Sequence, residues 1–366
     1  MRRRIFVFIA VFQSLLLLIH LLVYETWTFS APSQNRRWIA WALGALSVSF
    51  VAASLLAFRY SNAVVGAFYK VAAVWVGILT FLTFAAVLSW IFFGIARLAG
   101  ATPNFHRIVE ILSGLGALLG AYAILNAGWT RTTRIRVRLA NLPEAWRSRK
   151  IALISDLHLG PVRNGGFLRR MVALLMKQSP DAIFIAGDLY DGTAIDEWQA
   201  AAPLSALSAP HGVYFAAGNH EQFRDDTKYL NAVAAAGVRV LNDEKVEVDG
   251  LQIAGISYRT STQPGNLAAA LKKLELDRNR PSILLAHAPD HPAVAEAAGI
   301  SLQLSGHTHL GQYIPWTWIA QRIYGQFVYG LSRIGGLQVY TSSGAGTWGP
   351  PLRLGSNPEI VVLQLE

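Results

Sequence analysis

Residues 151–366 carry five short polar motifs that offer oxygen and imidazole nitrogen. None of them offers sulfur, because the chain contains no cysteine. Carboxylate, amide and imidazole groups together are the ligands of hydrolytic centres that hold two metal ions. The motifs therefore predict a two-metal hydrolytic site. They are Ser155-Asp156-Leu157-His158, Gly187-Asp188-Leu189-Tyr190-Asp191, Gly218-Asn219-His220-Glu221, Leu285-Ala286-His287 and Gly306-His307-Thr308-His309.

Each motif comes at the end of a short apolar run that has the composition of a strand. Runs with helical spacing lie between them, as in 167–178, where Leu168, Val172 and Leu175 share one face. Such alternation predicts a layered α/β domain. Ligands bind beyond the carboxyl ends of strands in these domains, so we expect the motifs to meet there. The expected strands are 135–139, 151–155, 181–186, 212–217, 238–241, 245–248, 251–256, 282–286, 302–304, 337–341 and 360–365.

Positive charge is concentrated in residues 1–150, which carry 16 Lys and Arg against 3 Asp and Glu, a net charge of +13. Residues 151–366 carry 16 against 19, a net charge of −3, so that the two parts add up to the +10 of the whole chain. The part that holds the motifs is not basic, and we expect no nucleic-acid partner. The basic excess lies in an apolar region, where it predicts the orientation of a membrane protein.

Four apolar runs in that region reach the roughly 20 residues that cross a bilayer as a helix. We therefore expect a transmembrane region over 1–130 and an α/β domain over 131–366. Basic residues flank the first and the last run, and the positive-inside rule places both ends in the cytoplasm. The sequence predicts an integral protein of a bacterial-type inner (plasma) membrane whose α/β domain is cytoplasmic. The expected helices are 5–24, 38–58, 71–95 and 108–127.

Polar and small residues in or beside the apolar runs require a separate interpretation in three places. Arg3-Arg4-Ile5-Phe6 resembles a twin-arginine export signal, but no clear cleavage site follows and three further apolar runs come after it. His20 and Gln13 lie within the first run, where a hydrogen bond between helices is expected. Gly116 and Gly120 would let another helix approach the fourth run closely. Membrane anchoring is the favoured interpretation.

In this order, the five motifs resemble those of the calcineurin-like metallophosphoesterase superfamily over about 135–366. The closing motif, extended to Leu310-Gly311-Gln312, and the later Arg353-Leu354-Gly355 and Pro358-Glu359-Ile360 are similar to its membrane-anchored YkuE-like branch. That branch includes transmembrane proteins with a metallophosphoesterase domain, and it more often has Gly where this chain has Leu310. The resemblance implies two packed mixed sheets flanked by helices, and hydrolysis that depends on two divalent metal ions.

The resemblance also implies a role for each motif residue. His220 assists the leaving oxygen, and Asp191 and Glu221 orient imidazoles or metal-bound water. Manganese is the favoured metal, with iron and zinc as alternatives. His291 is the competitor of His287, which we favour because it ends a strand. The implied ligands are Asp156, His158 and His309 for one ion, Asn219, His287 and His307 for the other, and Asp188 as the bridge between them.

An aromatic segment over 313–331 follows the last motif, and its single charge is Arg322. With Tyr313, Trp316 and Trp318, it suggests a surface that meets acyl chains or the bilayer interface, while the alternative is a loop packed as ordinary core. Related membrane phosphoesterases hydrolyse UDP-diacylglucosamine in lipid A biosynthesis. We therefore expect a lipid-linked phosphodiester or pyrophosphate, UDP-diacylglucosamine-like or a phospholipid, to be cleaved by metal-activated hydroxide at the lipid bilayer.

Two other functions remain open from the sequence. A membrane-tethered phosphatase or phosphodiesterase could act on a soluble substrate, and its activity would not depend on the aromatic segment. A non-catalytic scaffold would be marked by lost ligands, and no ligand of the family pattern is lost here.

Overall fold

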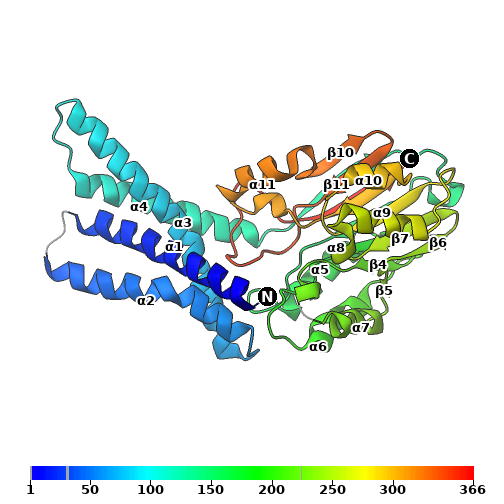
Figure 1. Ribbon diagram of the computed structural model, residues 1–366, viewed down its shortest axis with the longest axis horizontal. Coiled ribbons are helices and arrows are strands. Elements are labelled where there is room, and N and C mark those ends of the chain that lie inside the picture. Colours follow the sequence, from blue (N-terminus) through cyan, green and yellow to red (C-terminus); the bar gives the residue numbers. More distant parts are fainter. Residues whose placement is uncertain (1, 30–32, 224) are drawn as a thin grey trace. The chain divides into compact units, whose positions relative to one another are not determined.

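The computed structural model describes residues 2–29, 33–223 and 225–366. The chain forms two compact units (Figure 1). We call Met1–Leu125 with Gly349–Leu352 the N-terminal unit, and Asn126–Trp348 with Arg353–Glu366 the C-terminal unit.

Four long helices make up the N-terminal unit, and each is long and apolar enough to cross a membrane. The third begins well before the expected 71–95, because the Asn62 side chain caps it by accepting a hydrogen bond from the Val65 amide at 3.0 Å. At 36 residues it is about 54 Å long, more than the roughly 30 Å hydrocarbon core of a bilayer. The helices are α1 (Arg2–Thr28), α2 (Ser33–Ala57), α3 (Ala63–Leu98) and α4 (Phe105–Ala127).

Polar side chains and glycines hold these four helices together. Nε1 of Trp75 in α3 donates to Nε2 of His20 in α1 at 2.9 Å. The Gln13 side chain donates to the Ser47 carbonyl of α2 at 2.9 Å. A Cβ atom at Gly116 of α4 would lie 3.1 Å from a backbone oxygen of α3, so the glycine permits close packing. These polar residues therefore serve contacts between helices.

The C-terminal unit contains two six-stranded mixed sheets. In the first, β12 runs parallel to β1 and antiparallel to β2, and β2 to β5 are parallel. The first sheet has the order β1 (Arg131–Val137), β12 (Glu359–Leu365), β2 (Lys150–Ile154), β3 (Ala182–Ala186), β4 (Val213–Ala216) and β5 (Arg239–Val240). The second has the order β10 (Gly330–Ile334), β11 (Leu337–Thr341), β9 (Leu302–Ser305), β8 (Ser282–Ala286), β7 (Leu251–Ile256) and β6 (Glu244–Val248).

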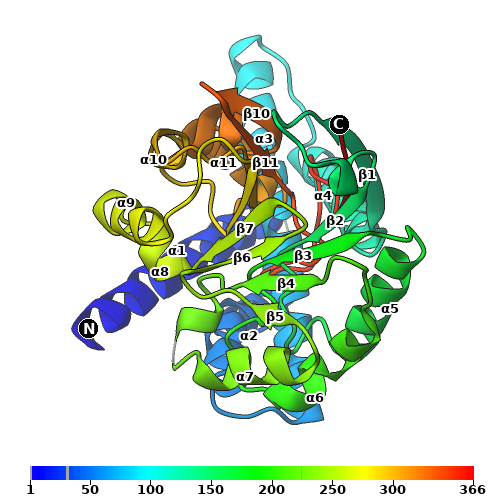
Figure 2. The same cartoon turned by 90° about the vertical axis from the view of Figure 1, so that its right-hand side faces the viewer.

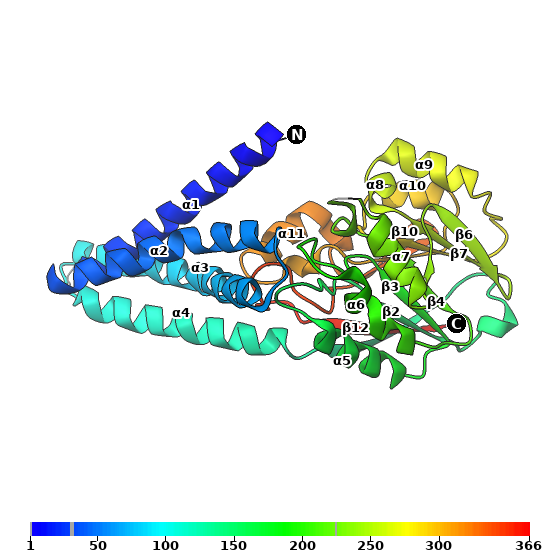
Figure 3. The ribbon, with the colours of Figure 1, turned by 90° about the horizontal axis from the view of Figure 1, so that it is seen from below.

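Helices cover the outer faces of both sheets, with α5 to α7 on one side and α8 to α10 on the other (Figures 2 and 3). The α-helices are α5 (Gly165–Met176), α6 (Glu197–Ala201), α7 (Thr227–Ala235), α8 (Tyr258–Ser261), α9 (Pro264–Lys273), α10 (Pro292–Ala297) and α11 (Trp316–Tyr324). Short 3₁₀ helices occupy Glu144–Trp146, Ala202–Ala206, Glu221–Phe223, His309–Gly311 and Gly325–Phe327.

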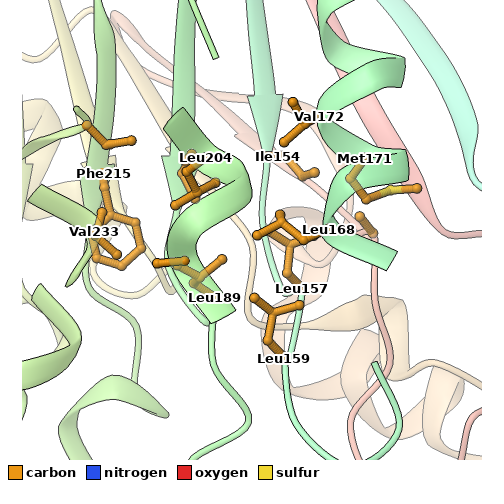
Figure 4. Packing of buried hydrophobic residues seen from close by; sticks show 14 of the residues in the cluster. Ile154, Leu157, Leu159, Leu168, Met171, Val172, Leu189, Leu204, Phe215 and Val233 are labelled. Carbon is orange, nitrogen blue, oxygen red and sulfur yellow. The ribbon is translucent and has the colours of Figure 1, made fainter. Parts of the chain in front are cut away.

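Apolar side chains fill three layers around these sheets. Between the sheets, Leu153 and Phe184 of the first pack in one cluster with Ile253 and Ile283 of the second. On the outer face of the first sheet, strands pack against α5, α7 and the 3₁₀ helix at Ala202–Ala206 (Figure 4). The central strands are buried on both faces, as their continuous apolar runs predict. The expected architecture of two packed mixed sheets flanked by helices is confirmed.

Two expectations about the elements were wrong. The opening strand runs over Arg131–Val137 instead of 135–139, because it pairs in parallel with β12, with Arg131 opposite Glu359. The aromatic segment, considered as a loop, contains α11 and the start of the strand β10, which pairs with β11 in an antiparallel hairpin. Charged or polar residues at exposed positions hid both β1 and β10 from a pattern based on apolar runs.

Candidate metal centre

The two sheets share the predicted ligands, and every ligand follows the carboxyl end of a strand. The first sheet supplies the residues after β2, β3 and β4, and the second supplies those after β8 and β9. The residues from the first sheet are Asp156, His158, Asp188 and Asn219, and those from the second are His287, His307 and His309.

Asp156, His158 and His309 form the first group. Nε2 of His309 lies 3.3 Å from Oδ1 of Asp156 and 3.0 Å from Nε2 of His158. One donor atom from each of the three lies within 4.8 Å of the others. The structure thus brings together the three residues that the resemblance assigned to one ion.

Asp188, His287 and His307 form the second group, again with donor atoms within 4.8 Å of one another. Nε2 of His287 lies 3.1 Å from Oδ2 of Asp188. Asn219 joins them, since its Oδ1 lies 3.0 Å from Nδ1 of His307. Oδ2 of Asp188 is also 3.8 Å from Nε2 of His158. Asp188 therefore borders both groups, as a bridging ligand must.

The cluster contains buried nitrogen and oxygen atoms that could bind a metal ion and have no hydrogen-bond partner in the protein. Within the described ranges, Nδ1 of His158 and Oδ1 of Asp191 are buried and complete no hydrogen bond. Burial lowers the pKa of His158 and of His309 well below the usual value, and the nearby His220 and Arg353 respectively add to the effect. Burial likewise lowers the pKa of His307 to about 4. Neutral imidazoles are the form that binds metal ions.

The carboxylates of the cluster require positive charge beside them. Burial opposes ionisation of Asp188, but the neighbouring His287 and His220 outweigh it and hold the pKa of Asp188 well below its usual range. Burial would lower the pKa of His287, but Asp188 and Asp156 outweigh burial and raise that pKa to about 10. A carboxylate this deeply buried is stable only when cations accompany it. Divalent ions meet that need, so the residues fit a dinuclear metal centre.

His220 points its free ring nitrogen toward Asp188. Its Nδ1 donates to the Asp191 carbonyl at 2.9 Å, since a carbonyl can only accept, and Nε2 lies 3.9 Å from Oδ2 of Asp188. The Asp191 side chain lies beside His158, with Oδ1 3.7 Å from Nδ1 of that ring. Burial and the nearby Asp188 raise the pKa of Asp191 well above its usual range. The role expected for Asp191, orienting an imidazole or metal-bound water, stays a prediction.

Glu221, which was expected to orient imidazoles or metal-bound water, contacts backbone amides. Its buried carboxylate accepts hydrogen bonds from the amides of Asp188 at 3.0 Å, Tyr190 at 3.0 Å and Gly218 at 2.7 Å. Burial and Asp188 raise its pKa to about 7. Glu221 therefore fixes the loops after β3 and β4 in register, which places Asp188 beside Asn219.

The glycines of the motifs leave room for the ligands. A Cβ atom at Gly218 would lie 2.1 Å from Oδ1 of Asp188, and one at Gly306 would lie 2.3 Å from Oδ2 of Asp156. Neither contact is possible for a real side chain. Each glycine is thus required because a carboxylate occupies the space of the missing side chain.

Several ligands also adopt the left-handed backbone conformation that non-glycine residues avoid. Such residues cluster at functional sites, where the surrounding structure holds them in place. Leu310, at a position where the resemblance leads us to expect Gly more often, has φ 49° and ψ 35°, a conformation that glycine adopts without strain. The ligands with positive φ are Asp156 (55°), His158 (49°), Asp188 (51°), His307 (70°) and His309 (50°).

Arg353 is a residue of the site whose role the sequence did not reveal. Its buried guanidinium donates to the carbonyls of His309 at 2.8 Å, Ser343 at 2.8 Å and Gly346 at 2.7 Å. Its Nη2 atom lies 3.3 Å from Nδ1 of His309. Arg353 therefore positions the loop of His309. The motif Arg353-Leu354-Gly355 was visible in the sequence, but only the fold shows where the side chain points.

Aromatic side chains surround the centre. The Tyr258 ring lies 5.4 Å from the His307 ring, and the Tyr324 ring, at the end of α11, lies 6.1 Å from it. The half-exposed Trp348 ring lies 5.7 Å from the His220 ring. Tyr258 and Trp348 could not be predicted from the sequence, since neither belongs to a motif. The contact of Tyr324 places α11 next to the metal ligands.

The other histidines of the C-terminal unit lie outside the cluster. His291, the competitor of His287, donates from Nε2 to the Thr262 carbonyl at 3.0 Å and belongs to no group of possible ligands within the described residues. His211 stacks on Trp146 at 4.3 Å. Among the substrate-segment residues, Tyr313 is buried, whereas Trp316, Trp318 and Arg322 are exposed on α11.

Comparison with known proteins agrees with this geometry. The family model for calcineurin-like phosphoesterases matches residues 149–311. An uncharacterized metallophosphoesterase of Campylobacter jejuni is 29% identical over 297 residues, which cover 78% of this chain and 79% of that protein. A Danio rerio protein named transmembrane protein with metallophosphoesterase domain is 32% identical over 287 residues, covering 74% of this chain and 65% of that one. An uncharacterized metallophosphoesterase of Aquifex aeolicus is 31% identical over 257 residues, covering 69% of this chain and 98% of that one.

The chain spans less than two thirds of the length of the Danio rerio relative and nearly all of the Aquifex aeolicus one. The protein belongs to the calcineurin-like metallophosphoesterase family.

Proposed function

We propose that this metallophosphoesterase hydrolyses a phosphodiester or pyrophosphate bond of a lipid-linked substrate, UDP-diacylglucosamine-like or a phospholipid, with manganese as the favoured metal. Catalysis would take place in the cytoplasm, at the inner (plasma) membrane. The observation that carries this proposal is the exposed apolar surface of α11 next to the metal ligands.

That surface consists of large side chains that ordinary folding would bury. Trp316 is 50%, Trp318 61%, Ile319 46% and Ile323 67% exposed, while Thr317 and Ala320 face the interior. Exposed Trp and Ile on one helix, with Arg322 among them, are typical of helices that lie at a membrane interface. The Tyr324 ring of the same helix lies beside the His307 ring. The phosphate group of a lipid whose acyl chains contact α11 would therefore lie near the metal ligands.

The residues of the site have different roles in the proposed reaction. When bound, the two metal ions activate water and neutralise the charge of the phosphate group. The carboxylates of Asp188 and Asp156 would offset part of the positive charge of the bound ions. Glu221 and Arg353 fix the loops that carry the ligands through hydrogen bonds to the backbone. His220 donates from Nδ1 to the Asp191 carbonyl, which directs Nε2 toward the leaving oxygen; with both ring nitrogens protonated, His220 would donate the Nε2 proton to that oxygen.

The test compares two substrates with full-length protein in detergent. Wild type, Trp318→Gln and Trp198→Gln are assayed on a lipid-linked pyrophosphate and on a water-soluble phosphodiester. Trp198 is a matched control, because it is 54% exposed and lies on α6. We expect Trp318→Gln to lower kcat/KM on the lipid substrate about tenfold, through lost apolar contact worth about 1.5 kcal/mol. Both variants should hydrolyse the soluble ester as wild type does.

The alternatives give different outcomes in the same assay. Equal kcat/KM of all three proteins on both substrates would favour a tethered enzyme for soluble substrates. Asp188→Asn should abolish turnover and lower the metal content measured by mass spectrometry. Turnover that Asp188→Asn leaves unchanged would contradict the catalytic assignment, and absence of any turnover in metal-loaded wild type would favour a scaffold.

A further inference from the structure

A second concave surface lies on the first sheet, away from the metal ligands. It is a cavity of about 490 Å³. Four of its lining residues are cations and none is an acid; the others are two glutamines and two aliphatic residues. The lining residues are Arg134, Ile135, Arg136, Lys150, Lys177, Gln178, Val362 and Gln364. We call this surface the cationic cavity.

Strand pairing and strand polarity bring these charges together. Arg134 and Arg136 are two residues apart on β1, so that they project from the same face of the strand. In the neighbouring β12, Gln364 lies opposite Arg136 on one side and Lys150 of β2 on the other. Lys177 caps the carboxyl end of α5. Segments far apart in the sequence thus contribute cations to one depression.

Acidic residues neutralise this charge only in part. Nε of Arg136 lies 3.4 Å from a carboxylate oxygen of Glu366, and an Nη atom of Arg134 donates to Gln178 at 2.8 Å. The side chains of Lys150 and Lys177 have no hydrogen-bond or ion-pair partner within the described residues. Like charges this close repel each other, and an anion bound between them would relieve the repulsion. A phosphate group suits arginine and lysine donors in particular.

The cationic cavity lies at the opposite end of the strands from the metal centre. Lys150 begins β2, whereas Asp156 follows the carboxyl end of the same strand. Six residues of extended chain correspond to about 20 Å. A ligand in the cationic cavity would therefore not be the ester that is being cleaved.

We propose that the cationic cavity is a binding site for a phosphate-bearing anion, separate from the catalytic centre. An anionic phospholipid headgroup and a free phosphate ion share this chemistry. The proposal does not depend on the lipid-linked substrate, because it concerns different residues and a different end of the sheet.

The test measures binding to full-length, metal-loaded protein in detergent by titration calorimetry. The probes are short-chain phosphatidylglycerol, short-chain phosphatidylcholine and inorganic phosphate. The cavity variant is Lys150→Gln/Lys177→Gln. The matched control is Lys272→Gln/Lys273→Gln on α9, because it removes the same charge from two exposed lysines that have no partner among the described residues. Turnover of a soluble phosphodiester serves as a check that both variants keep an intact catalytic centre.

We expect phosphatidylglycerol to bind the cavity variant about 30-fold more weakly than wild type or the control, because each of the two lysines contributes about fivefold to the binding of an anionic lipid near a membrane surface. Phosphatidylcholine should bind all three proteins alike. The same selective loss with inorganic phosphate would also support the site and would identify a soluble ligand. The proposal is overturned if both anions bind the cavity variant as tightly as the control, or if neither anion binds wild type.

Discussion

Replacement of Gly218 by alanine should disable the metal centre without unfolding the protein. The new Cβ atom would lie 2.1 Å from Oδ1 of Asp188 and 2.6 Å from the backbone nitrogen of Asp188. Real Cβ contacts stay above 3.0 Å, so the carboxylate must retreat by the difference of about 0.9 Å. Displacement of a catalytic group by about 1 Å lowers turnover on the order of 100-fold. Overpacking of this kind costs about 1–3 kcal/mol, less than the total stability of a typical domain.

The assay for Gly218→Ala combines turnover, metal content and thermal unfolding. We expect about 100-fold lower kcat on a soluble phosphodiester, reduced metal content by mass spectrometry and a cooperative unfolding transition. Gly336→Ala is the control, because nothing lies within 4 Å of a Cβ atom at that position; it should behave as wild type does. The reasoning is refuted if Gly218→Ala keeps two metal ions per chain and turns over at the wild-type rate.

Three further predictions concern stability and topology. Leu310→Gly should stabilise the protein by about 1 kcal/mol in thermal unfolding, because a left-handed conformation costs leucine about that amount; a lower Tm would contradict this. Arg353→Met should destabilise by more than about 3 kcal/mol, because the carbonyls of His309, Ser343 and Gly346 lose their donor. Loss of only about 0.5 kcal/mol, the amount expected for the exposed control Arg333→Met, would show that Arg353 does not hold the loop. Because the chain has no cysteine, a single introduced cysteine is the one site that a maleimide can label. In sealed cells, an impermeant maleimide should label Thr102→Cys and should not label Ala268→Cys. The reverse pattern would place the catalytic unit outside.

The sequence predicted the buried strands more accurately than the edge strands. The strands β7, β8 and β11 have the expected bounds, β3 and β9 differ by one residue at one end, and β2 differs by one residue at each end. These strands are buried on both faces, so their apolar runs are continuous. The bounds of β1 and the existence of β10 could not be read in this way, because arginines and serines alternate with apolar residues at their exposed positions.

The residue types of the site could be predicted from the sequence more readily than the contacts of those residues. The motif order identified ligand types, and the structure brings the seven expected ligands together. Glu221 illustrates the limit, because its contacts are with backbone amides, and no residue pattern records where an amide points. Tyr258 and Trp348 lie beside the centre but belong to segments without a motif. Three-dimensional neighbours that come from unrelated loops leave no local trace in a single sequence.

The division of the ligands between two sheets has a consequence for the domain as a whole. Each sheet alone holds only part of either coordination set, so bound ions would act as cross-links that fasten one sheet to the other along their shared carboxyl edge. Any ligand that binds only the folded state adds stability in proportion to the logarithm of its free concentration. The supply of divalent metal in the cell would then govern how long the catalytic domain survives proteolysis as well as how fast it works.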